Sequence, residues 1–236
     1  MTDQLYLTDA YIQQFEAEVT AHLEGGVVLS QTAFYPGGGG QPNDMGTLSQ
    51  GDQTWQVTRV RKASGQVVHV IDGDLPPIGS TVSGQLDWAR RYQLMRTHTA
   101  MHILCGVVWR DYEAQVTGGN MEPLKGRMDF EFESMQKDLV QEIEAAVNRE
   151  VEASRDVRVQ ILPREEVFQI PDLIRTKINL LPPQIQEVRT VELVGLDLQA
   201  DGGTHVRNTS EVGRMRIPNY KSKGKINKRI YVELDN

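Results

Sequence analysis

The chain has 236 residues, enough for one large domain or two smaller ones. Its 39% hydrophobic and 24% charged residues are typical of a soluble globular protein. No apolar run approaches the ~20 residues of a membrane span, and the polar first residues carry no signal region. A single cysteine excludes an internal disulfide framework and favours a cytoplasmic location. The net charge of -7 argues against nonspecific duplex binding over the whole surface, but not against a local basic patch.

Residues 5 to about 88 predict an all-β domain. Apolar and polar residues alternate over 15–23, and Gly25-Gly26 separates this run from a predicted strand at 27–32. Further strands are predicted at 55–60, 67–70 and 82–86. Short strands at this spacing favour a small barrel or sandwich.

A glycine-rich stretch, TAFYPGGGGQPNDMG, occupies residues 32–46 of this domain. Its four consecutive glycines let another backbone approach closely, so Gly38, Gly39 and Gln41 are candidates for contact with a substrate. The backbone N–H groups of such a loop can hold phosphate or the end of an RNA strand. A flexible hairpin end is an equally good interpretation. A Walker loop is excluded because no Gly-Lys-Ser/Thr follows.

The pattern changes from strand to helix at residues 87–91, which predicts a domain boundary between 88 and 89. Over 90–110, Leu94, His98, His102, Cys105 and Trp109 share one helical face. The other faces are nearly as apolar beyond His102, so this helix is expected to be buried between layers.

The remaining elements alternate between strands and helices. Residues 115–120, ending TGGN, predict a turn, and Ser134 is a plausible N-cap for a helix that runs to about 154. Strands are expected around 128–132, at 157–161 and at 187–193, short helical pieces over 163–177, and a hairpin at 215–220 and 229–234. We therefore predict an α+β protein, with a small N-terminal β-barrel domain (1–88) followed by an α/β two-layer domain (89–236).

Histidines provide the strongest chemical signal. His98 and His102 lie one helical turn apart, so both imidazoles leave the same face. Such a pair can hold a metal ion, most often zinc, but does not complete its shell. His205 ends the segment Asp-Gly-Gly-Thr-His, whose Asp201 is a further potential ligand. The prediction is a three-histidine metal site with or without an oxygen from Asp201. Paired histidines alone are often only a satisfied polar patch.

Cys105 follows His102 by three residues and lies on the same face. It can supply a sulfur ligand, but its neighbours form an apolar run and free cysteine is among the most buried residue types. We favour a core role.

Four motifs occur in one order: GGGQP, the HxxxH helix, GGTHVRNTSEVG and a terminal YKSKGKINKRIY. Together they resemble the editing domain of alanyl-tRNA synthetase, and most of all the free-standing AlaX-type trans-editing proteins of the medium-length kind. The resemblance spans nearly the whole chain. It implies a zinc-binding editing domain, with one zinc per chain, that hydrolyses the ester of tRNA(Ala) wrongly carrying serine, with the glycyl ester as a second candidate substrate.

The histidines that this resemblance assigns to zinc fall on His98, His102 and His205. Asp201 stands where the family usually has cysteine. Either Asp201 ligates through oxygen and makes a harder site, or three histidines and a water form an open catalytic site. Loss of the metal is a third alternative, disfavoured because all three histidines are retained.

An aminoacyl ester is activated, so a metal-held water suffices to hydrolyse it. Thr99 replaces the glutamate of HExxH, which argues against peptide hydrolysis. The general base is then the terminal ribose hydroxyl or the metal-held water itself. Selecting serine over alanine requires a group that hydrogen-bonds the serine hydroxyl. Thr32 is the first candidate, and Thr117 and Asn120 are the next, although the last two are as plausible as turn residues. Asp129 is expected to face water in a structural role.

A basic run close to the C-terminus has no acidic residue within it. Its members are Arg214, Arg216, Lys221, Lys223, Lys225, Lys228 and Arg229. On an acidic protein this pattern indicates contact with a phosphate backbone, with Tyr220 available to stack on an unpaired base. Such a run can also be only a solvated face.

Two other functions fit the sequence. A non-catalytic RNA-binding module with a structural zinc is favoured if Asp201 closes the metal shell. A metallohydrolase for a small ester or amide would act without tRNA.

Overall fold

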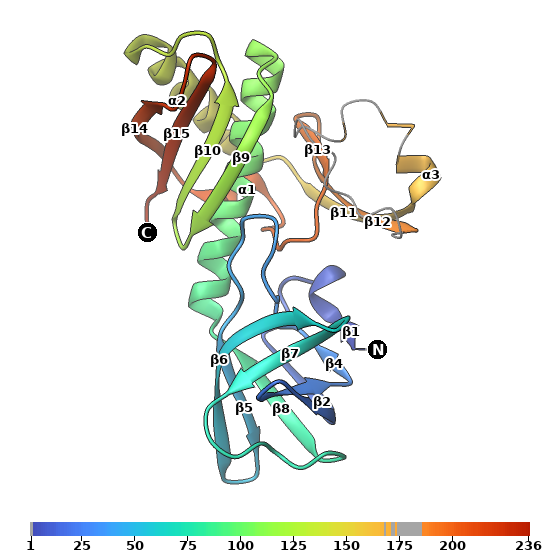
Figure 1. The fold of residues 1–236 in the computed structure, drawn as a ribbon. Helices are drawn as coiled ribbons and strands as arrows, with labels where there is room; N and C mark the ends of the chain where they lie inside the picture. The colour runs from blue at the N-terminus through green and yellow to red at the C-terminus, as the bar shows by residue number, and fades with distance from the viewer. Residues whose placement is uncertain (1, 168, 171–172, 174–185) are drawn as a thin grey trace. The chain divides into compact units, whose positions relative to one another are not determined.

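The structure, a computed structural model, describes residues 2–167, 169–170, 173 and 186–236 (Figure 1). The chain divides into two units, Met1–Gln93 and Leu94–Asn236, which meet inside helix α1 (Trp88–Tyr112). This junction lies just beyond the boundary predicted between residues 88 and 89. The predicted α+β class with an N-terminal barrel is confirmed. Within the described residues, no helix combines the length and the apolar character that a membrane crossing requires.

Six strands of the first unit form a closed barrel in the order β2-β3-β7-β6-β5-β8. They are β2 (Gln14–Leu23), β3 (Gly26–Leu29), β5 (Gly46–Gln50), β6 (Gln53–Ala63), β7 (Gln66–Ile71) and β8 (Thr81–Leu86). A 3-10 turn at Leu5–Leu7 and a short parallel pair, β1 (Asp3–Gln4) with β4 (Gln31–Thr32), complete the unit. Alternation along β2 places Phe15, Ala17 and Val19 in the core, as predicted. Strand β5 was not predicted, because Leu48 is its one buried apolar residue.

The glycine-rich stretch forms a tight turn. Its four glycines, 37 to 40, all have positive φ, a conformation that favours glycine. The Gly38 N–H donates to the Gln41 carbonyl at 3.0 Å, and the Gln41 N–H donates back at 2.9 Å. Gly38 and Gly39 are exposed at the tip, whereas Gln41 is buried. Just beyond the turn, the Asp44 carboxylate accepts from the Tyr35 N–H at 2.7 Å and forms a buried ion pair with Arg91.

Thr32 lies fully buried in the core of the barrel unit. Its hydroxyl accepts from the Phe34 N–H at 3.1 Å and lies 2.8 Å from Nε2 of His69. Nδ1 of His69 is 3.2 Å from the Val27 carbonyl, so Nδ1 donates and Nε2 accepts from the Thr32 hydroxyl. The hydroxyl that was predicted to recognise serine is therefore hydrogen-bonded to His69 and Phe34 inside the barrel unit. Burial lowers the pKa of His69 to about 4.

This neutral histidine is expected to make stability depend on pH. Between pH 6.5 and about 4 the unfolded chain takes up a proton at His69, whereas the folded chain does not. The free energy of unfolding therefore falls as the pH falls through this window, by about 3 kcal/mol at most from this residue. Urea unfolding of the full chain and of His69→Gln between pH 4 and 7 measures the difference. Parallel profiles for the two proteins would contradict the assignment.

In the described part of the second unit, the strands form two sheets. One has the order β14-β15-β10-β9 and the other the order β11-β12-β13. Their strands are β9 (Val116–Glu122), β10 (Lys125–Glu131), β14 (Met215–Ser222), β15 (Asn227–Leu234), β11 (Val157–Pro163), β12 (Glu187–Leu193) and β13 (Asp197–Ala200). The unit also has helices α2 (Lys137–Glu152) and α3 (Arg164–Val167) and a 3-10 turn at Thr209–Val212.

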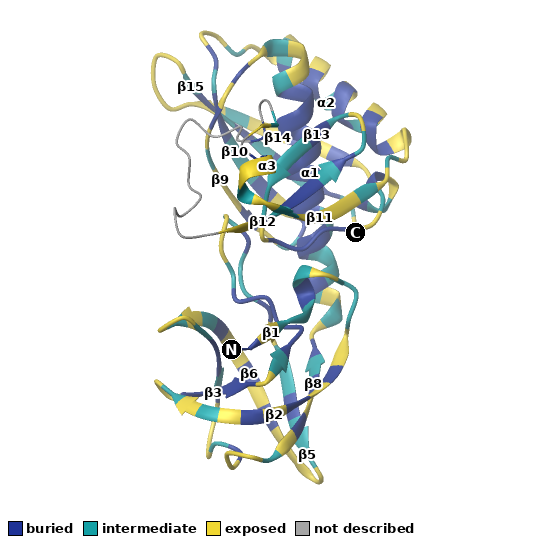
Figure 2. Cartoon of the chain, turned by 90° about the vertical axis from the view of Figure 1, so that its right-hand side faces the viewer, coloured by how far each residue is buried: buried dark blue, intermediate teal, exposed yellow. Residues whose placement is uncertain are grey.

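Helix α1 lies between these sheets, which confirms the prediction that it is buried (Figure 2). A Cβ on Gly126 of β10 would lie 2.5 Å from the Met101 sulfur, so the four-stranded sheet approaches α1 closely there. A Cβ on Gly106 would meet the Leu196 side chain, just before β13, at 2.8 Å. Small residues therefore let both layers contact the helix.

Several predicted elements differ from the observed ones. The predicted turn at 115–120 is wrong: residues 116–120 belong to strand β9, in which Gly118 and Gly119 pair with β10. Ser134 is not an N-cap, because α2 begins after Gln136 with no side-chain cap. The strands at 157–161 and 187–193 and the C-terminal hairpin are confirmed, whereas β13 was not predicted. Part of the region predicted as short helices, 163–177, lies outside the described residues; α3 falls within the rest.

Candidate metal centre

The structure brings together the four residues that the sequence predicted as metal ligands. His98 and His102 leave α1, while Asp201 and His205 lie in the loop after β13, and their ligand atoms all lie within 4.8 Å of one another. Oδ2 of Asp201 is 2.6 Å from Nε2 of His205, 3.4 Å from that of His98 and 3.7 Å from that of His102. All three imidazoles are buried, and the Asp201 side chain is 13% exposed.

The backbone around Asp201 is fixed by β12. The Asp201 N–H donates to the Arg189 carbonyl at 3.0 Å, and the Arg189 guanidinium donates to the Asp201 carbonyl at 2.8 Å. The Gly203 N–H donates to Oδ1 of Asp201 at 3.1 Å, which leaves Oδ2 directed at the imidazoles. Neither Gly202 nor Gly203 has a positive φ, so the bend does not use a conformation that favours glycine.

Each histidine has a partner that orients its ring. Nδ1 of His102 donates to Oδ2 of Asp197 at 3.0 Å, and Nδ1 of His205 lies 3.2 Å from the Thr99 hydroxyl. His98 is hydrogen-bonded to the backbone of Thr204. Metal-ligating histidines usually hold their other ring nitrogen in this way, because the partner fixes both tautomer and orientation.

The protonation states suit a cation. Burial lowers the pKa of His98 to about 4 and, together with the neighbouring His98, holds that of His205 well below its ordinary value. Burial also acts to lower the pKa of His102, but the hydrogen bond and charge of Asp197 outweigh it and raise that pKa. For Asp201, burial acts to raise the pKa, yet the surrounding imidazoles hold it well below its usual range. His98 and His205 therefore offer neutral imidazole nitrogens beside an ionised carboxylate.

These donors fit zinc. Ligand distances of about 2.0–2.1 Å place the donors of a tetrahedral site roughly 3.3–3.4 Å apart. The contacts of Asp201 with His98 and His102, at 3.4 and 3.7 Å, are near that separation. The 2.6 Å contact with His205 is a hydrogen-bond distance and would lengthen on binding. Three imidazoles and one carboxylate form a donor set typical of zinc sites.

Cys105 does not belong to this cluster. It is buried, and its sulfur accepts a hydrogen bond from Nε2 of Gln199 at 3.3 Å. The same amide nitrogen lies 2.7 Å from Oδ2 of Asp197, the carboxylate that orients His102. Sequence reasoning missed Asp197 and Gln199. Their spacing of two residues, just before Asp201, was the available signal, since such residues share one face of a strand.

Asp197 is expected to control metal affinity. Asp197→Asn keeps the size of the side chain but removes the charge that favours donation by Nδ1 of His102. Loss of such a partner typically weakens metal binding about 10- to 100-fold. Competition with a chromophoric chelator measures the change, and Asp138→Asn, on the exposed first turn of α2, is the matched control. Equal affinities for the two variants would contradict the role of Asp197.

The two remaining substrate candidates lie on β9 rather than in a turn. Thr117 is exposed, and its hydroxyl donates to Oδ1 of Asn227 at 3.3 Å. Asn120 is exposed, and its Oδ1 accepts from the Met121 N–H at 2.9 Å.

The residues of the basic run differ in their surroundings. Arg214, Lys221, Lys223 and Lys225 are exposed. Arg216 is exposed but pairs with Asp235 at 2.7 Å. Lys228 is only 7% exposed, and its ammonium donates to the carbonyls of Gly224 and Lys225, so it holds the β14–β15 turn.

Comparison with known proteins gives consistent matches. Residues 5–90 match the family "tRNA synthetases class II (A)", and residues 188–231 match the "Threonyl and Alanyl tRNA synthetase second additional domain". The chain is 41% identical to the alanyl-tRNA editing protein AlaX-M of Saccharolobus solfataricus, over 98% of each chain. It is 37% identical to the protein of the same name from Methanosarcina barkeri, over 99% of each. It is also 36% identical to the alanine–tRNA ligase of Ignicoccus hospitalis, over 92% of this chain and 24% of the ligase.

Proposed function

Because this chain belongs to the AlaX-M family of alanyl-tRNA editing proteins, we propose that it hydrolyses, in trans, the ester of tRNA(Ala) that wrongly carries serine. The glycyl ester is the second candidate substrate, and the cytoplasm, where tRNA is charged, is the proposed location. The observation that carries the proposal is the convergence of His98, His102, His205 and Asp201. We assign one zinc ion per chain to this cluster.

The zinc would be held by the three imidazoles, with Asp201 beside them. When bound, it supplies a Lewis acid that polarises the ester carbonyl and lowers the pKa of a bound water toward ~7. Asp197 and Thr99 keep the rings of His102 and His205 in the ligating orientation. Because the pKa of Asp201 lies well below its usual range, this carboxylate is a weak base. It therefore serves as a ligand or fixed charge rather than as the general base. The water that attacks the ester carbonyl loses a proton, and the ribose oxygen that leaves takes one up to become the terminal hydroxyl of the tRNA.

The RNA part of the proposal rests on the C-terminal hairpin. Its exposed cations, Arg214, Lys221, Lys223 and Lys225, are proposed to contact phosphates of the tRNA. Arg216 and Lys228 are expected to contribute less, because each is already paired within the unit.

The test is deacylation of charged tRNA by purified protein. We expect Ser-tRNA(Ala) to lose its amino acid much faster than in buffer and faster than Ala-tRNA(Ala). If neither ester is lost faster than in buffer, the proposed deacylase activity is refuted. Equal rates for the two esters would refute discrimination but not hydrolysis.

A non-catalytic RNA-binding module is the second candidate, supported by Asp201 as a fourth donor within reach. Four protein ligands can close a tetrahedral shell, as in structural zinc sites. Chelation separates the two functions. A structural site should unfold the domain when stripped, whereas the proposed catalytic site should lose activity and keep its circular dichroism spectrum.

Position 201 allows a sharper test of ligation. Asp201→Cys introduces the residue that the family usually has there and is expected to retain zinc, because thiolate is a strong zinc ligand. Asp201→Ala is expected to bind zinc more weakly if the carboxylate ligates. Equal zinc affinity in the wild type and Asp201→Ala would assign the ion to the histidines alone.

A further inference from the structure

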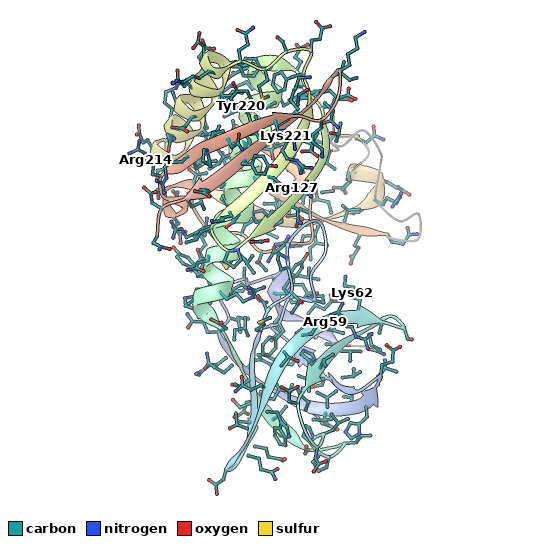
Figure 3. All side chains as sticks on the ribbon, turned by 60° about the vertical axis from the view of Figure 1, so that its left-hand side comes forward. Arg59, Lys62, Arg127, Arg214, Tyr220 and Lys221 are labelled. Carbon is teal, nitrogen blue, oxygen red and sulfur yellow. The ribbon has the colours of Figure 1, made fainter. Side chains whose placement is uncertain are left out.

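The four-stranded sheet of the second unit has one face turned away from the helices. Its inner face packs on α1 through Gly126 and on α2, where the Ile217 N–H donates to Glu144. Strand pairing places two adjacent rows of side chains on the opposite, outer face. One row is Asn120, Arg127, Tyr231 and Asn219, and the next is Gly118, Asp129, Arg229 and Lys221. Figure 3 shows Arg127 and Lys221 on this sheet.

Cations outnumber carboxylates in these two rows. Asp129 accepts two hydrogen bonds from Arg229, at 2.7 and 2.8 Å, and has Arg127 at 3.8 Å. Asp129 was expected to face water, but it is only 9% exposed, because these arginines cover it. Arg127, Arg229, Lys221 and Lys223 outnumber the acidic Asp129 and Glu131 near these rows, on a chain whose net charge is -7. At the other end of the face, the carboxylates Glu122 and Glu233 lie opposite Lys125. Asp129 therefore orients Arg229 while leaving an excess of positive charge.

An aromatic ring lies within this positive surface. Tyr231 is partly exposed, and the Arg229 guanidinium carbon is 6.0 Å from its ring centroid. A cavity of about 190 Å³ adjoins the ring and is lined also by Asn120, Glu122, Lys125 and Arg127. Lys125 lies opposite Glu122 and pairs with Glu233 at 3.4 Å, so carboxylates offset its charge, whereas that of Arg127 faces the ring. An aromatic face, an amide and an arginine are groups with which proteins hold an unpaired nucleotide: the ring stacks on the base, the amide bonds its edge and the guanidinium binds phosphate.

We propose that this cavity binds one unpaired nucleotide of the RNA substrate, stacked on Tyr231. Asn120 contacts the edge of the base, and Arg127 and Lys221 bind the flanking phosphates. The site rests on the proposed function, since it takes the same RNA. It extends the predicted basic run to β9 and β10, which lie about a hundred residues earlier in the sequence.

The experiment compares Tyr231→Leu with Tyr231→Phe in the full chain. Phenylalanine retains the stacking face and leucine does not, so we expect the Kd for uncharged tRNA(Ala) and the KM for Ser-tRNA(Ala) to rise about tenfold in Tyr231→Leu alone. Zinc content and Tm should match the wild type. The kcat should also be unchanged, because the ring is proposed to bind RNA rather than the reacting ester.

The phosphate contacts have a separate readout. Arg127→Gln is expected to reduce the slope of log Kd against log salt by about 0.7–0.9. Arg149→Gln removes one exposed cation from α2, on the other side of the sheet, and should leave the slope unchanged. Wild-type affinity and salt slope in both Tyr231→Leu and Arg127→Gln would overturn the inference. If the variants are unaffected but the wild type deacylates Ser-tRNA(Ala), the nucleotide site is refuted and the proposed function stands. If the wild type itself does not deacylate Ser-tRNA(Ala), the proposed function is refuted, and the Kd for uncharged tRNA(Ala) still tests the nucleotide site.

Discussion

His205→Ala is expected to lower kcat/KM for Ser-tRNA(Ala) on the order of a thousandfold. The side chain is a proposed ligand from the loop that also carries Asp201, and its Nε2 lies 2.6 Å from the Asp201 carboxylate. Its loss would leave two helix histidines and one carboxylate to hold the ion. A thousandfold loss corresponds to about 4 kcal/mol of transition-state stabilisation, comparable with the removal of one electrostatic stabiliser in an acyl-transfer enzyme. Single-turnover deacylation and zinc analysis of the same preparation measure both effects.

Two substitutions control for this result. His22→Gln removes a histidine of the barrel unit, whose ring contacts the Pro76 carbonyl at 2.8 Å, and should keep full activity. Cys105→Ala removes the one thiol and should keep the zinc, because the sulfur contacts Gln199 outside the cluster. Zinc loss in Cys105→Ala with zinc retained in His205→Ala would reverse our assignment of ligands. Unchanged kcat/KM in His205→Ala would refute the catalytic role of the site.

The four candidate ligands were predictable from the sequence because the spacing within each pair is local. One turn of helix places His98 above His102, and the Asp201–His205 segment is short enough to act as a unit. That the two pairs converge could be expected only from the combination of motifs and from the resemblance. The groups that orient the rings depend instead on tertiary register. Asp197 reaches His102 because β13 pairs with β12, and β13 itself is too short to give a clear periodic signal.

Two glycines made a strand of the second unit look like a turn, because strand pairing does not show in local composition. The TGGN segment has the composition of a turn, yet Gly118 and Gly119 lie in β9 and pair with Asp129 and Met128 of β10. The basic residues near the C-terminus likewise do not define the cationic face by themselves. Lys228 alternates onto the buried face of β15, where it binds turn carbonyls, whereas Arg127 joins the outer cationic face from another strand. A period of two assigns residues to faces only once the strands are known.

The largest expected effect on stability comes from the ion pair beside the glycine turn. Asp44→Ala is expected to lower the free energy of unfolding by about 3–5 kcal/mol, because it leaves a buried guanidinium without its counter-charge. Arg91 is fully buried and donates Nε to both oxygens of Asp44, at 3.0 and 2.9 Å. The carbonyls of Ala10 and Ala33 also accept from it, but they carry no compensating charge. Urea unfolding followed by tryptophan fluorescence measures the loss.

An exposed pair of the same unit gives the matched control. The side chains of Arg61 and Glu24 are 27% and 50% exposed and lie 2.6 Å apart, so Glu24→Ala should cost no more than about 1 kcal/mol. The double variant Asp44→Leu/Arg91→Met then tests whether the loss of stability comes from the unpaired buried guanidinium of Arg91. If the loss in Asp44→Ala arises from an uncompensated charge, removing both charges restores most of the stability, since apolar pairs often replace buried ion pairs without loss. If the double variant is as unstable as Asp44→Ala, the hydrogen bonds to Tyr35, Ala10 and Ala33, rather than the charge, hold the turn in place.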